Sequence, residues 1–351
     1  MPSVTEFKRK VFHRFGPPEV FQWQSFTIPK LNPSEVLIRV KFSGVNYADI
    51  IARRGYYKWA GALPICVGFE IAGEIIDKGE NVTLPIGAKV LAVTKFGGYS
   101  EVVITAQNRI WPIPDNMRLE EAAALPAVYL TAHHSLMEVM RIRRGEDILI
   151  QAVAGGVGIA ALQIAKHVGL TVYGTASTEE KLQFAATHGL DFGINYVRED
   201  FEDAMRHLTQ SRGVKFLLDS LGGYGLRKGI RCLQPRGHAV TIGAAGIVPP
   251  AGINWNSAKE WNRIAGDFLR GGVYHPFYLI ERNLSLSGVQ VLLLWDELEY
   301  FQRVMHELLA WHQAGIISPH IDAVFPLDRV AEAHRLVEQR RSKGKVLLAA
   351  F

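Results

Sequence analysis

Short hydrophobic runs separated by turn residues characterise the chain from about residue 8 to residue 111. Their β-branched side chains and the turn residues between them are typical of strands. The runs lie at 36–40, 72–76, 89–93 and 101–104. We therefore predict that this part of the chain is mainly β.

After Pro112 and Pro114 the pattern changes to helical periods that alternate with apolar, strand-like runs. These runs lie at 147–151, 171–175, 215–219, 238–242 and 285–291. Such an alternation predicts a parallel sheet covered by helices. The tail breaks this alternation: 318–322 is extended, 327–340 is helix-like and 344–351 is an apolar strand. The tail can therefore fold back onto the first, mainly β part of the chain.

Residues 148–165 carry no charge and, at about 18 residues, reach the length at which a membrane helix has to be considered. Gly155, Gly156 and Gly158 fall in the middle of this segment, where each would cost a continuous helix about 1 kcal/mol. A buried strand, a turn and a buried helix explain the segment better. We therefore expect no membrane-spanning segment.

The composition narrows the class of protein. The 351 residues hold 39 Lys and Arg against 34 Asp and Glu, and the resulting net charge of +5 argues against nucleic acid binding. The hydrophobic fraction of 48% excludes disordered and fibrous classes, and the length suggests two domains. Two cysteines, Cys66 and Cys232, are too few for a disulfide framework. The charged residues near the start have no apolar stretch behind them, so we expect no secretory signal. We expect a cytoplasmic protein.

The stretch around the three glycines carries the clearest chemistry. Ala152, Gly155 and Gly158 take the three positions of a dinucleotide-binding fingerprint, with a small residue in place of the first glycine. Such a turn brings backbone N–H groups and the positive end of a helix to a pyrophosphate. Close packing of a strand against a helix, without a ligand, is the alternative. The strand before and the helix after favour a dinucleotide site.

The end of the next strand bears on the choice of nucleotide. An NADH site usually has a carboxylate at that strand end, whereas Ser177 and Thr178 stand there in this chain. Glu179 and Glu180 come slightly later, and Ser177 with Glu180 has the spacing of a helix capping box. Ser177, Thr178 and Lys181 can instead surround a 2′-phosphate. We therefore favour NADPH over NADH.

Further motifs identify a resemblance. They are 44–49 (GVNYAD) with Arg53, Gly55 and Tyr57; 64–70 (PICVGFE); 121–126 (EAAALP) with 130–132 (LTA); and the AGGVG turn at 154–158. With them the chain resembles a zinc-free member of the medium-chain dehydrogenase/reductase superfamily, close to quinone oxidoreductases. The stretches 319–322 and 344–348 resemble most the subgroup of vesicle amine transport protein homologues.

The resemblance implies an α/β fold of two domains. A GroES-like, mainly β catalytic domain would span 1–126 and 315–351, and a Rossmann domain with a doubly wound parallel sheet would span 127–314 and bind NADPH. A substrate cleft would lie at their junction, and two copies would form a homodimer through the edge of the Rossmann sheet. Zinc-dependent relatives have Cys, His and Cys where this chain has Asn46, Phe69 and, by our alignment, Ala127. None of the three is a plausible zinc ligand, so we expect no metal.

The resemblance also implies site residues. Asn46, Thr131 and Tyr57 would be catalytic, and Arg53 with Tyr57 would bind substrate. The cofactor would contact Ala152, Gly155, Gly156, Val157, Gly158, Ser177, Lys181, Tyr196, Gly243 and Arg340. Packing beside the adenine pocket is the alternative for Tyr196, and simple solvation is the alternative for Arg340. Arg53 and Tyr57 would lie on a substrate-side loop. Asp49 and Glu70 would hold that loop and the turn after Gly68 by hydrogen bonds.

Two departures from relatives stand out. His133 and His134 occupy positions that are usually aromatic or aliphatic, where they would alter the cleft wall or only pack within a helix. The aromatic-rich stretch 254–278 would form a helix and lid over the cleft, or a dimer contact, with core packing the alternative for any single ring.

Without zinc, hydride addition to an already electrophilic acceptor needs the least assistance, which points to quinones and α,β-unsaturated carbonyls (enals and enones). Tyr57 or Asn46 would donate a hydrogen bond to the developing oxygen anion, and Tyr57 or solvent would deliver the proton. An enoyl-thioester reductase remains an alternative, with Arg141, Arg143 and Arg144 as a basic entrance or as plain solvated surface. A nucleotide-binding interaction or membrane-associated protein with little turnover is the other alternative.

Overall fold

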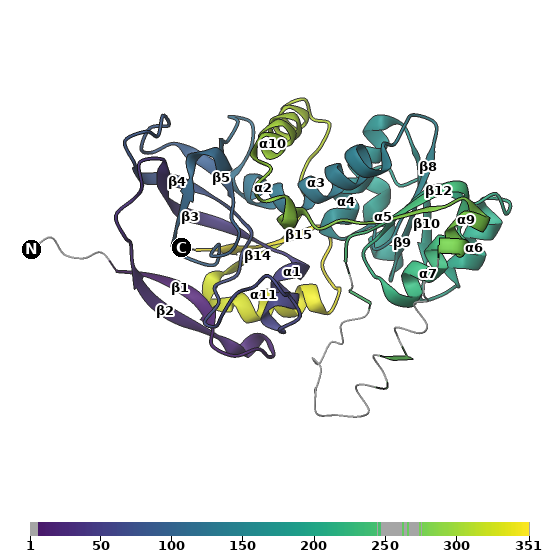
Figure 1. Cartoon of the computed structure of the whole chain (residues 1–351), viewed down its shortest axis with the longest axis horizontal. Coiled ribbons are helices and arrows are strands. Elements are labelled where there is room, and N and C mark those ends of the chain that lie inside the picture. The colour runs from purple at the N-terminus through teal and green to yellow at the C-terminus, as the bar shows by residue number, and fades with distance from the viewer. Residues whose placement is uncertain are drawn as a thin grey trace, which may run out of the picture. The chain divides into compact units, whose positions relative to one another are not determined.

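The computed structural model describes residues 6–243, 245–246, 262, 265–266, 274 and 276–350. The chain forms two compact units (Figure 1). Unit 1 comprises Met1–Leu130 and Leu292–Phe351, and unit 2 comprises Thr131–Val291. The predicted lid at 254–278 lies mostly outside the described residues.

Unit 1 is built on β-structure, as predicted. Its larger sheet has seven strands among the described residues, in the order β14-β15-β3-β4-β5-β7, with β6 also paired to β3. The strands are β3 (Glu35–Val45), β4 (Glu70–Lys78), β5 (Lys89–Val93), β6 (Val102–Ala106), β7 (Ile110–Pro112), β14 (Ile321–Pro326) and β15 (Lys345–Ala349). A separate antiparallel ribbon joins β1 (Glu6–Phe12) to β2 (Phe21–Thr27).

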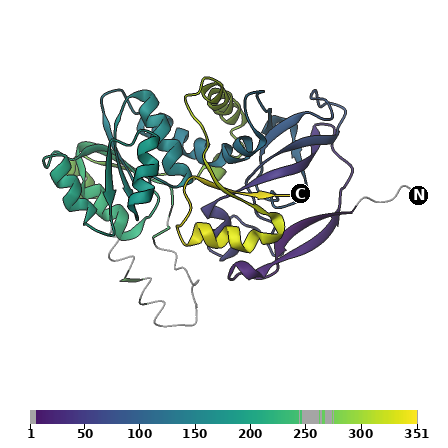
Figure 2. The ribbon, with the colours of Figure 1, turned by 180° about the vertical axis from the view of Figure 1, so that it is seen from behind.

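The C-terminal tail belongs to this sheet. β15 pairs antiparallel with β3, with Val346 opposite Val45, and β14 runs parallel beside β15. Figure 2 shows the yellow C-terminal segment among the purple and blue strands of unit 1. The remaining helices of the unit are η1 (Pro18–Val20), α1 (Tyr47–Arg53), η2 (Gln107–Arg109), α2 (Leu119–Ala124), α10 (Leu298–Gln313), η5 (Leu327–Arg329) and α11 (Val330–Glu338).

Helix α10 marks a difference from the expected boundaries. The division at residue 315 assigns this helix to the Rossmann domain, whereas it packs in unit 1. There the Gln302 side chain donates a hydrogen bond to the Asn108 carbonyl at 2.7 Å. The Arg109 guanidinium lies 3.6 Å from the centre of the Trp295 ring, just before the helix. The exact domain boundaries remain a prediction.

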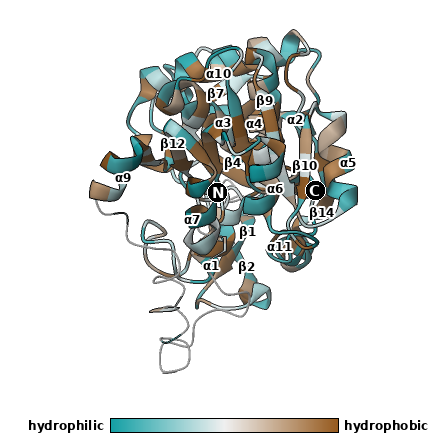
Figure 3. Ribbon diagram, turned by 90° about the vertical axis from the view of Figure 1, so that its right-hand side faces the viewer, coloured by the Kyte–Doolittle hydropathy of each residue, from teal (hydrophilic) through white to brown (hydrophobic). Residues whose placement is uncertain are grey.

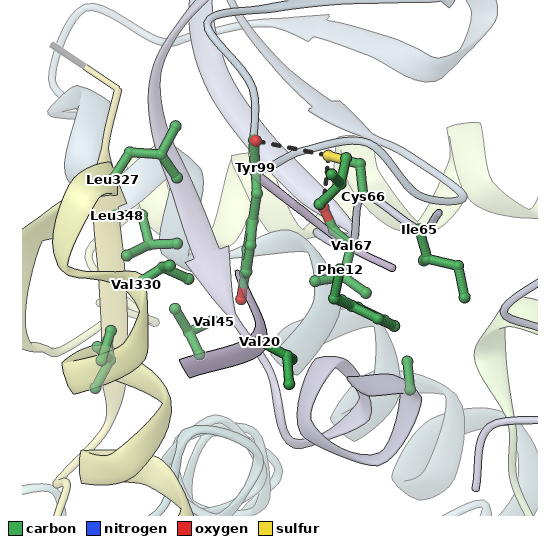
Figure 4. Packing of buried hydrophobic residues seen from close by; sticks show 14 residues of the cluster. Phe12, Val20, Val45, Ile65, Cys66, Val67, Tyr99, Leu327, Val330 and Leu348 are labelled. Carbon is green, nitrogen blue, oxygen red and sulfur yellow. Dashed lines mark hydrogen bonds between the residues drawn. The ribbon is translucent and has the colours of Figure 1, made fainter. Parts of the chain in front are cut away.

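A cluster of buried side chains holds the ribbon, β3 and the tail of unit 1 together (Figure 4). Tyr99 lies fully buried within it, and its carbonyl faces the Cys66 thiol at 3.5 Å. Burial raises the pKa of Cys66 to about 12, because the thiolate would lose its solvation. This cysteine is therefore a core residue and not a nucleophile.

Unit 2 has a six-stranded parallel sheet among its described residues, in the order β10-β9-β8-β11-β12-β13. The strands are β8 (Asp147–Ile150), β9 (Thr171–Ala176), β10 (Phe192–Asn195), β11 (Val214–Asp219), β12 (Leu233–Thr241) and β13 (Ser285–Gly288). The helices are α4 (Gly156–Val168), α5 (Glu179–Thr187), α6 (Phe201–Leu208), α7 (Gly223–Arg231) and α9 (Pro276–Arg282). Helix α3 (Pro126–His133) runs into the unit and continues as η3 (His134–Met140), and η4 (Val291–Leu294) leaves it.

This order is that of a doubly wound dinucleotide-binding fold, which confirms the predicted fold class. Figure 1 shows α4 and α5 on one side of the strands and α6 and α7 on the other. Figure 3 shows hydrophobic colour concentrated on the strands, whereas the helices carry both colours. The uncharged segment 148–165 is strand, turn and helix, as expected. Within the described part of the chain, no helix is long and apolar enough to cross a membrane.

Candidate dinucleotide and acceptor site

The glycine turn between β8 and α4 has the geometry that its sequence predicts. Ala152 lies in the left-handed region at φ +51°, and its carbonyl accepts a hydrogen bond from Gly155 N–H at 2.9 Å. A Cβ on Gly158 would lie 2.4 Å from the Ala152 carbonyl oxygen and 2.5 Å from that of Val153. The third fingerprint position therefore has to be glycine for the helix to approach the strand.

Helix α4 begins at Gly156 directly after this turn. The N–H groups of Gly156, Val157 and Gly158 belong to its first turn, where an α-helix offers no carbonyl partners. The adjacent Gln151 side chain donates to the Gly225 carbonyl at 3.0 Å, and Val153 N–H donates to Thr175 O at 3.0 Å, so the turn is held to α7 and β9. This arrangement fits an anionic pyrophosphate.

The ends of β9 and β10 lie side by side in unit 2. Ala176 pairs with Asn195 in parallel register, and Tyr196 N–H donates to Ala176 O at 3.1 Å. The structure thus brings the half-buried Ser177 and Tyr196 to neighbouring strand ends. Both lie at the carboxyl ends of the strands, as the glycine turn does. Both positions suit contact with an adenosine ribose or its phosphate.

The predicted capping box of Ser177 and Glu180 is wrong. Thr178 is the N-cap of α5, and its hydroxyl accepts a hydrogen bond from Lys181 N–H at 3.3 Å. The helix starts one residue later than the spacing suggested, because β9 continues to Ala176. Ser177 is therefore not used as the cap.

Gly243 lies just beyond the end of β12, next to the end of β11. A Cβ on it would lie 3.0 Å from the Ser220 carbonyl oxygen, so a side chain there would crowd that turn. The neighbouring Asp219 is fully buried and accepts hydrogen bonds from Thr241 Oγ1 at 2.7 Å and from Gly222 N–H. Desolvation raises the pKa of Asp219. The sequence analysis missed this carboxylate, although it directly follows the apolar run 216–218 at the end of β11.

Unit 1 contains a buried polar cluster around Asn46, which precedes helix α1. The Asn46 Nδ2 donates to Glu70 Oε1 at 2.9 Å, and its Oδ1 accepts from Lys345 Nζ at 2.5 Å. Lys345 also lies 2.5 Å from Glu70 Oε1, and the two side chains are 4% and 0% exposed. The other Glu70 oxygen accepts from Ala127 N–H at 2.6 Å. Gly44 leaves room for the cluster, because a Cβ there would lie 2.2 Å from Glu70 Oε1.

This cluster fixes the orientation of the Asn46 amide. An ammonium group has no acceptor, so Lys345 can bond only to the amide oxygen, and the carboxylate of Glu70 can bond only to the amide nitrogen. One of the two N–H donors on Nδ2 is used by Glu70. The sequence analysis missed Lys345, whose only signal was its place in the GKVLL tail motif.

Asp49 is buried behind Asn46 and performs the role expected of it. Its carboxylate accepts hydrogen bonds from Asn46 N–H at 2.8 Å and from Gly68 N–H at 2.9 Å. The Tyr99 hydroxyl lies 3.2 Å from the same carboxylate and 3.0 Å from His334 Nε2. Burial raises the pKa of Asp49 to about 7 and lowers that of His334 well below its usual value.

Tyr57 lies in an aromatic group. Its ring centre is 5.9 Å from that of Phe69 and 6.3 Å from that of Phe96, both edge-on. Phe69, at the position where the resemblance implies a histidine in zinc-dependent relatives, instead packs its ring against Tyr57. Among the described residues, no group of three or more His, Cys, Asp or Glu side chains could hold a metal ion.

Arg53 differs from its expected environment. Its side chain is fully buried and forms an ion pair with Glu338 of α11, which also accepts from Arg54 Nε at 2.9 Å. A substrate in unit 1 would find no exposed part of this guanidinium. The burial and the ion pair favour a structural role for Arg53.

Arg340 is exposed after the end of α11, at φ +53°.

Thr131 lies in the last turn of α3, and its carbonyl accepts a hydrogen bond from Ser135 Oγ at 2.7 Å. His133 is 1% exposed and packs inside the unit, whereas His134 begins the following π-helical turn. Desolvation lowers the pKa of His134. Unit 2 therefore carries Thr131, the glycine turn, Ser177, Lys181, Tyr196 and Gly243, and unit 1 carries Asn46, Arg53, Tyr57 and Arg340.

Two family models match the chain. The alcohol dehydrogenase GroES-like domain matches residues 32–115, and the zinc-binding dehydrogenase model matches residues 188–348. Among curated relatives, the synaptic vesicle membrane protein VAT-1 homolog of Danio rerio is 34% identical over 91% of this chain, which spans 65% of that protein. Quinone oxidoreductase-like protein 2 of Mus musculus is 33% identical, over 91% of this chain and 86% of that protein.

Solved structures show the same fold. The quinone oxidoreductase of Escherichia coli complexed with NADPH has a TM-score of 0.85 and 28% identity, covering 97% of this chain and 99% of its own. The CurK enoyl reductase has a TM-score of 0.81 and 26% identity, covering 98% of this chain and 99% of its own.

Proposed function

Because the chain belongs to the medium-chain dehydrogenase/reductase superfamily of oxidoreductases, in its quinone oxidoreductase-like group near the VAT-1 homologues, we propose that it is an NADPH-dependent, zinc-independent reductase. Its acceptor would be a quinone or an α,β-unsaturated carbonyl. The observation that carries the proposal is the glycine turn of unit 2, with α4 starting at Gly156 and Ser177 at the neighbouring strand end.

The residues of unit 2 fit the cofactor. The first-turn N–H groups of α4 would bind the pyrophosphate, and Gly243 would allow close approach beside the end of β12. Ser177, Lys181 and Tyr196 would surround the 2′-phosphate, with Arg340 of unit 1 as a weaker candidate. When bound, the nicotinamide supplies the hydride. The E. coli quinone oxidoreductase, whose structure contains NADPH, supports this choice.

Asn46 is the better candidate for the donor to the acceptor oxygen. Lys345 and Glu70 fix its amide, and the second N–H on Nδ2 has no role in that pair of contacts. A donor that is already oriented stabilises a developing oxygen anion by about 3–4 kcal/mol. Thr131 would support the nicotinamide end. Tyr57, packed edge-on against two phenylalanines, would contact the acceptor and, with solvent as the alternative, deliver the proton.

The enoyl-thioester reductase stays a second candidate, because the CurK enoyl reductase shares the fold over nearly the whole chain. It would need an entrance for a phosphopantetheine arm. Arg141, Arg143 and Arg144 are exposed and follow η3, so they are the candidates for that entrance. A nucleotide-binding interaction protein with little turnover is the third candidate, and the name of the VAT-1 homolog, a synaptic vesicle membrane protein, favours it.

Rates of NADPH oxidation with a quinone, an enal, an enone and an enoyl thioester distinguish these candidates. We expect the quinone or enone to be reduced, and Asn46→Ala to lower kcat about 100-fold with the NADPH Kd little changed. Asn116→Ala, an exposed change in unit 1, is the matched control. Reduction of the thioester alone would favour the second candidate. NADPH binding without turnover of any acceptor would favour the third.

The proposal extends to assembly and location. β13 is an edge strand of the described sheet, and pairing of this edge with that of a second copy would form a homodimer. A monomer at every accessible concentration in solution would contradict this. Both cysteines are buried and free, which is consistent with a cytoplasmic, reducing compartment.

A further inference from the structure

Glu179 occupies a position that matters for nucleotide choice. It is the first residue of α5, follows the end of β9 by three positions and follows Gly158 by 179 − 158 = 21 positions. In NADH sites, a carboxylate about 20 residues after the glycines accepts a hydrogen bond from the ribose 2′-hydroxyl. By spacing alone, Glu179 would therefore favour NADH and repel a 2′-phosphate.

The structure shows this carboxylate bound to other partners. Asn195 Nδ2 donates to Glu179 Oε1 at 3.0 Å, and Arg198 Nη1 donates to the same oxygen at 3.3 Å. Asn195 is 5% exposed, and its own Oδ1 accepts from Val197 N–H at 3.1 Å, which directs its amide nitrogen toward Glu179. Asn195 is the last residue of β10, and Arg198 follows it by three positions. The end of β10 lies beside the end of β9.

We propose that Asn195 and Arg198 determine nucleotide preference by holding the Glu179 carboxylate and balancing its charge. This inference rests on the proposed function and names the residues that set its specificity. With Glu179 held, Ser177, Lys181 and Tyr196 receive the 2′-phosphate of NADPH without competition from the Glu179 carboxylate. With Glu179 released, its carboxylate repels that phosphate and accepts a hydrogen bond from the ribose 2′-hydroxyl of NADH.

Arg198 is the residue to change first, because its side chain is 72% exposed and its loss leaves the fold intact. The dissociation constants of NADPH and NADH would be measured by nucleotide fluorescence for the parent, Arg198→Ala, Glu179→Gln and the double variant. Arg198→Ala should lower the preference for NADPH about threefold, the size expected for an exposed ion pair. Asn195→Ala combined with Arg198→Ala should lower it about tenfold, because both donors are lost.

The Glu179→Gln background separates this mechanism from direct contact between Arg198 and the phosphate. If Arg198 acts through Glu179, Arg198→Ala should change the preference less than about twofold once the carboxylate is gone. The same loss in both backgrounds would overturn the inference, as would an unchanged preference in Arg198→Ala. Arg212→Ala is the matched control, because Arg212 pairs with Asp147 at the opposite end of the strands and should leave the preference unaltered.

The same titrations keep the two proposals apart. A parent protein that prefers NADPH while its variants do not change overturns the inference alone. A parent that binds neither nucleotide overturns the proposed function and the inference together.

Discussion

Replacing Lys345 by methionine tests the buried cluster that orients Asn46. The change removes the ammonium group and keeps an unbranched apolar chain of similar length. Lys345 Nζ lies 2.5 Å from Glu70 Oε1, and the side chains are 4% and 0% exposed. After the substitution, the Glu70 carboxylate would stay buried and negatively charged. Its remaining donors would be Asn46 Nδ2 and Ala127 N–H.

The expected loss of stability is large. At this distance and an effective dielectric constant of about 20, the attraction between the two charges is about 7 kcal/mol. The desolvation of both ions, several kcal/mol each, offsets most of that attraction, so forming the pair adds little. Removing one partner nevertheless leaves the other charge buried, which costs about 3–5 kcal/mol. We therefore expect Lys345→Met to lower the free energy of unfolding by about 3–5 kcal/mol.

Denaturant unfolding monitored by tryptophan fluorescence measures this loss, because most tryptophans of the sequence fall in unit 1. They are Trp23, Trp59, Trp111, Trp295 and Trp311. The double variant Glu70→Gln/Lys345→Met should recover at least about 2 kcal/mol relative to Lys345→Met, because no unpaired charge remains. Lys89→Met, at the exposed first position of β5, is the control and should change stability by less than about 0.5 kcal/mol. A loss below about 1 kcal/mol for Lys345→Met would refute the reasoning.

Three further changes test other parts of the structure. Gly158→Ala should weaken NADPH binding more than about tenfold in a fluorescence titration, because its Cβ would lie 2.4 Å from the Ala152 carbonyl oxygen; an unchanged Kd would contradict the geometry of the turn. Ala152→Gly should raise Tm, with a gain of up to about 1 kcal/mol in the free energy of unfolding, because glycine adopts φ +51° without strain. A lower Tm would count against strain at this residue. Asp49 binds its proton more tightly in the folded state, with a pKa of about 7 against the usual 3.8, so its contribution to stability is complete below pH 3.8 and is lost as the pH rises through 7. The stability of the parent relative to Asp49→Asn should therefore fall over that range, and a pH-independent difference would exclude the raised pKa.

The hydrophobic pattern was sufficient to predict a mainly β part and a parallel sheet covered by helices, whereas the family resemblance implied the GroES-like and Rossmann folds. The alternation of helical periods and apolar runs predicted the parallel sheet, and each predicted strand of unit 2 is present, as β8, β9, β11, β12 and β13. The family resemblance, which rested on motifs such as 44–49 and the glycine turn, is confirmed by the comparisons. These signals come from short stretches of neighbouring residues, so a single sequence is enough to detect them.

Two kinds of information were out of reach. The cap of α5 depended on whether β9 ends at Thr175 or at Ala176, and one residue decides between Ser177 and Thr178. The contact of Lys345 with Asn46 joins residues 299 positions apart, and only the pairing of β15 with β3 brings them together. Sequence position gives no hint of such a partner.

The same holds for the arginine predicted to bind substrate. Arg53 is the last residue of α1, although the resemblance implied a substrate-binding role for it. Its actual partner, Glu338, comes from a helix near the other end of the chain, and the pair is buried. Burial depends on which elements pack together, so a charged residue in a motif can be a structural ion pair as readily as a binding group.

The oxidation of NADPH by this protein, measured with a quinone and an enone and with NADH as the paired control, tests the central claim most directly. The account predicts that NADPH binds more tightly than NADH and is oxidised when either acceptor is present. Turnover with NADH in preference to NADPH would contradict the assignment of Ser177 and Lys181, and an absence of turnover with every acceptor would contradict the proposed reductase.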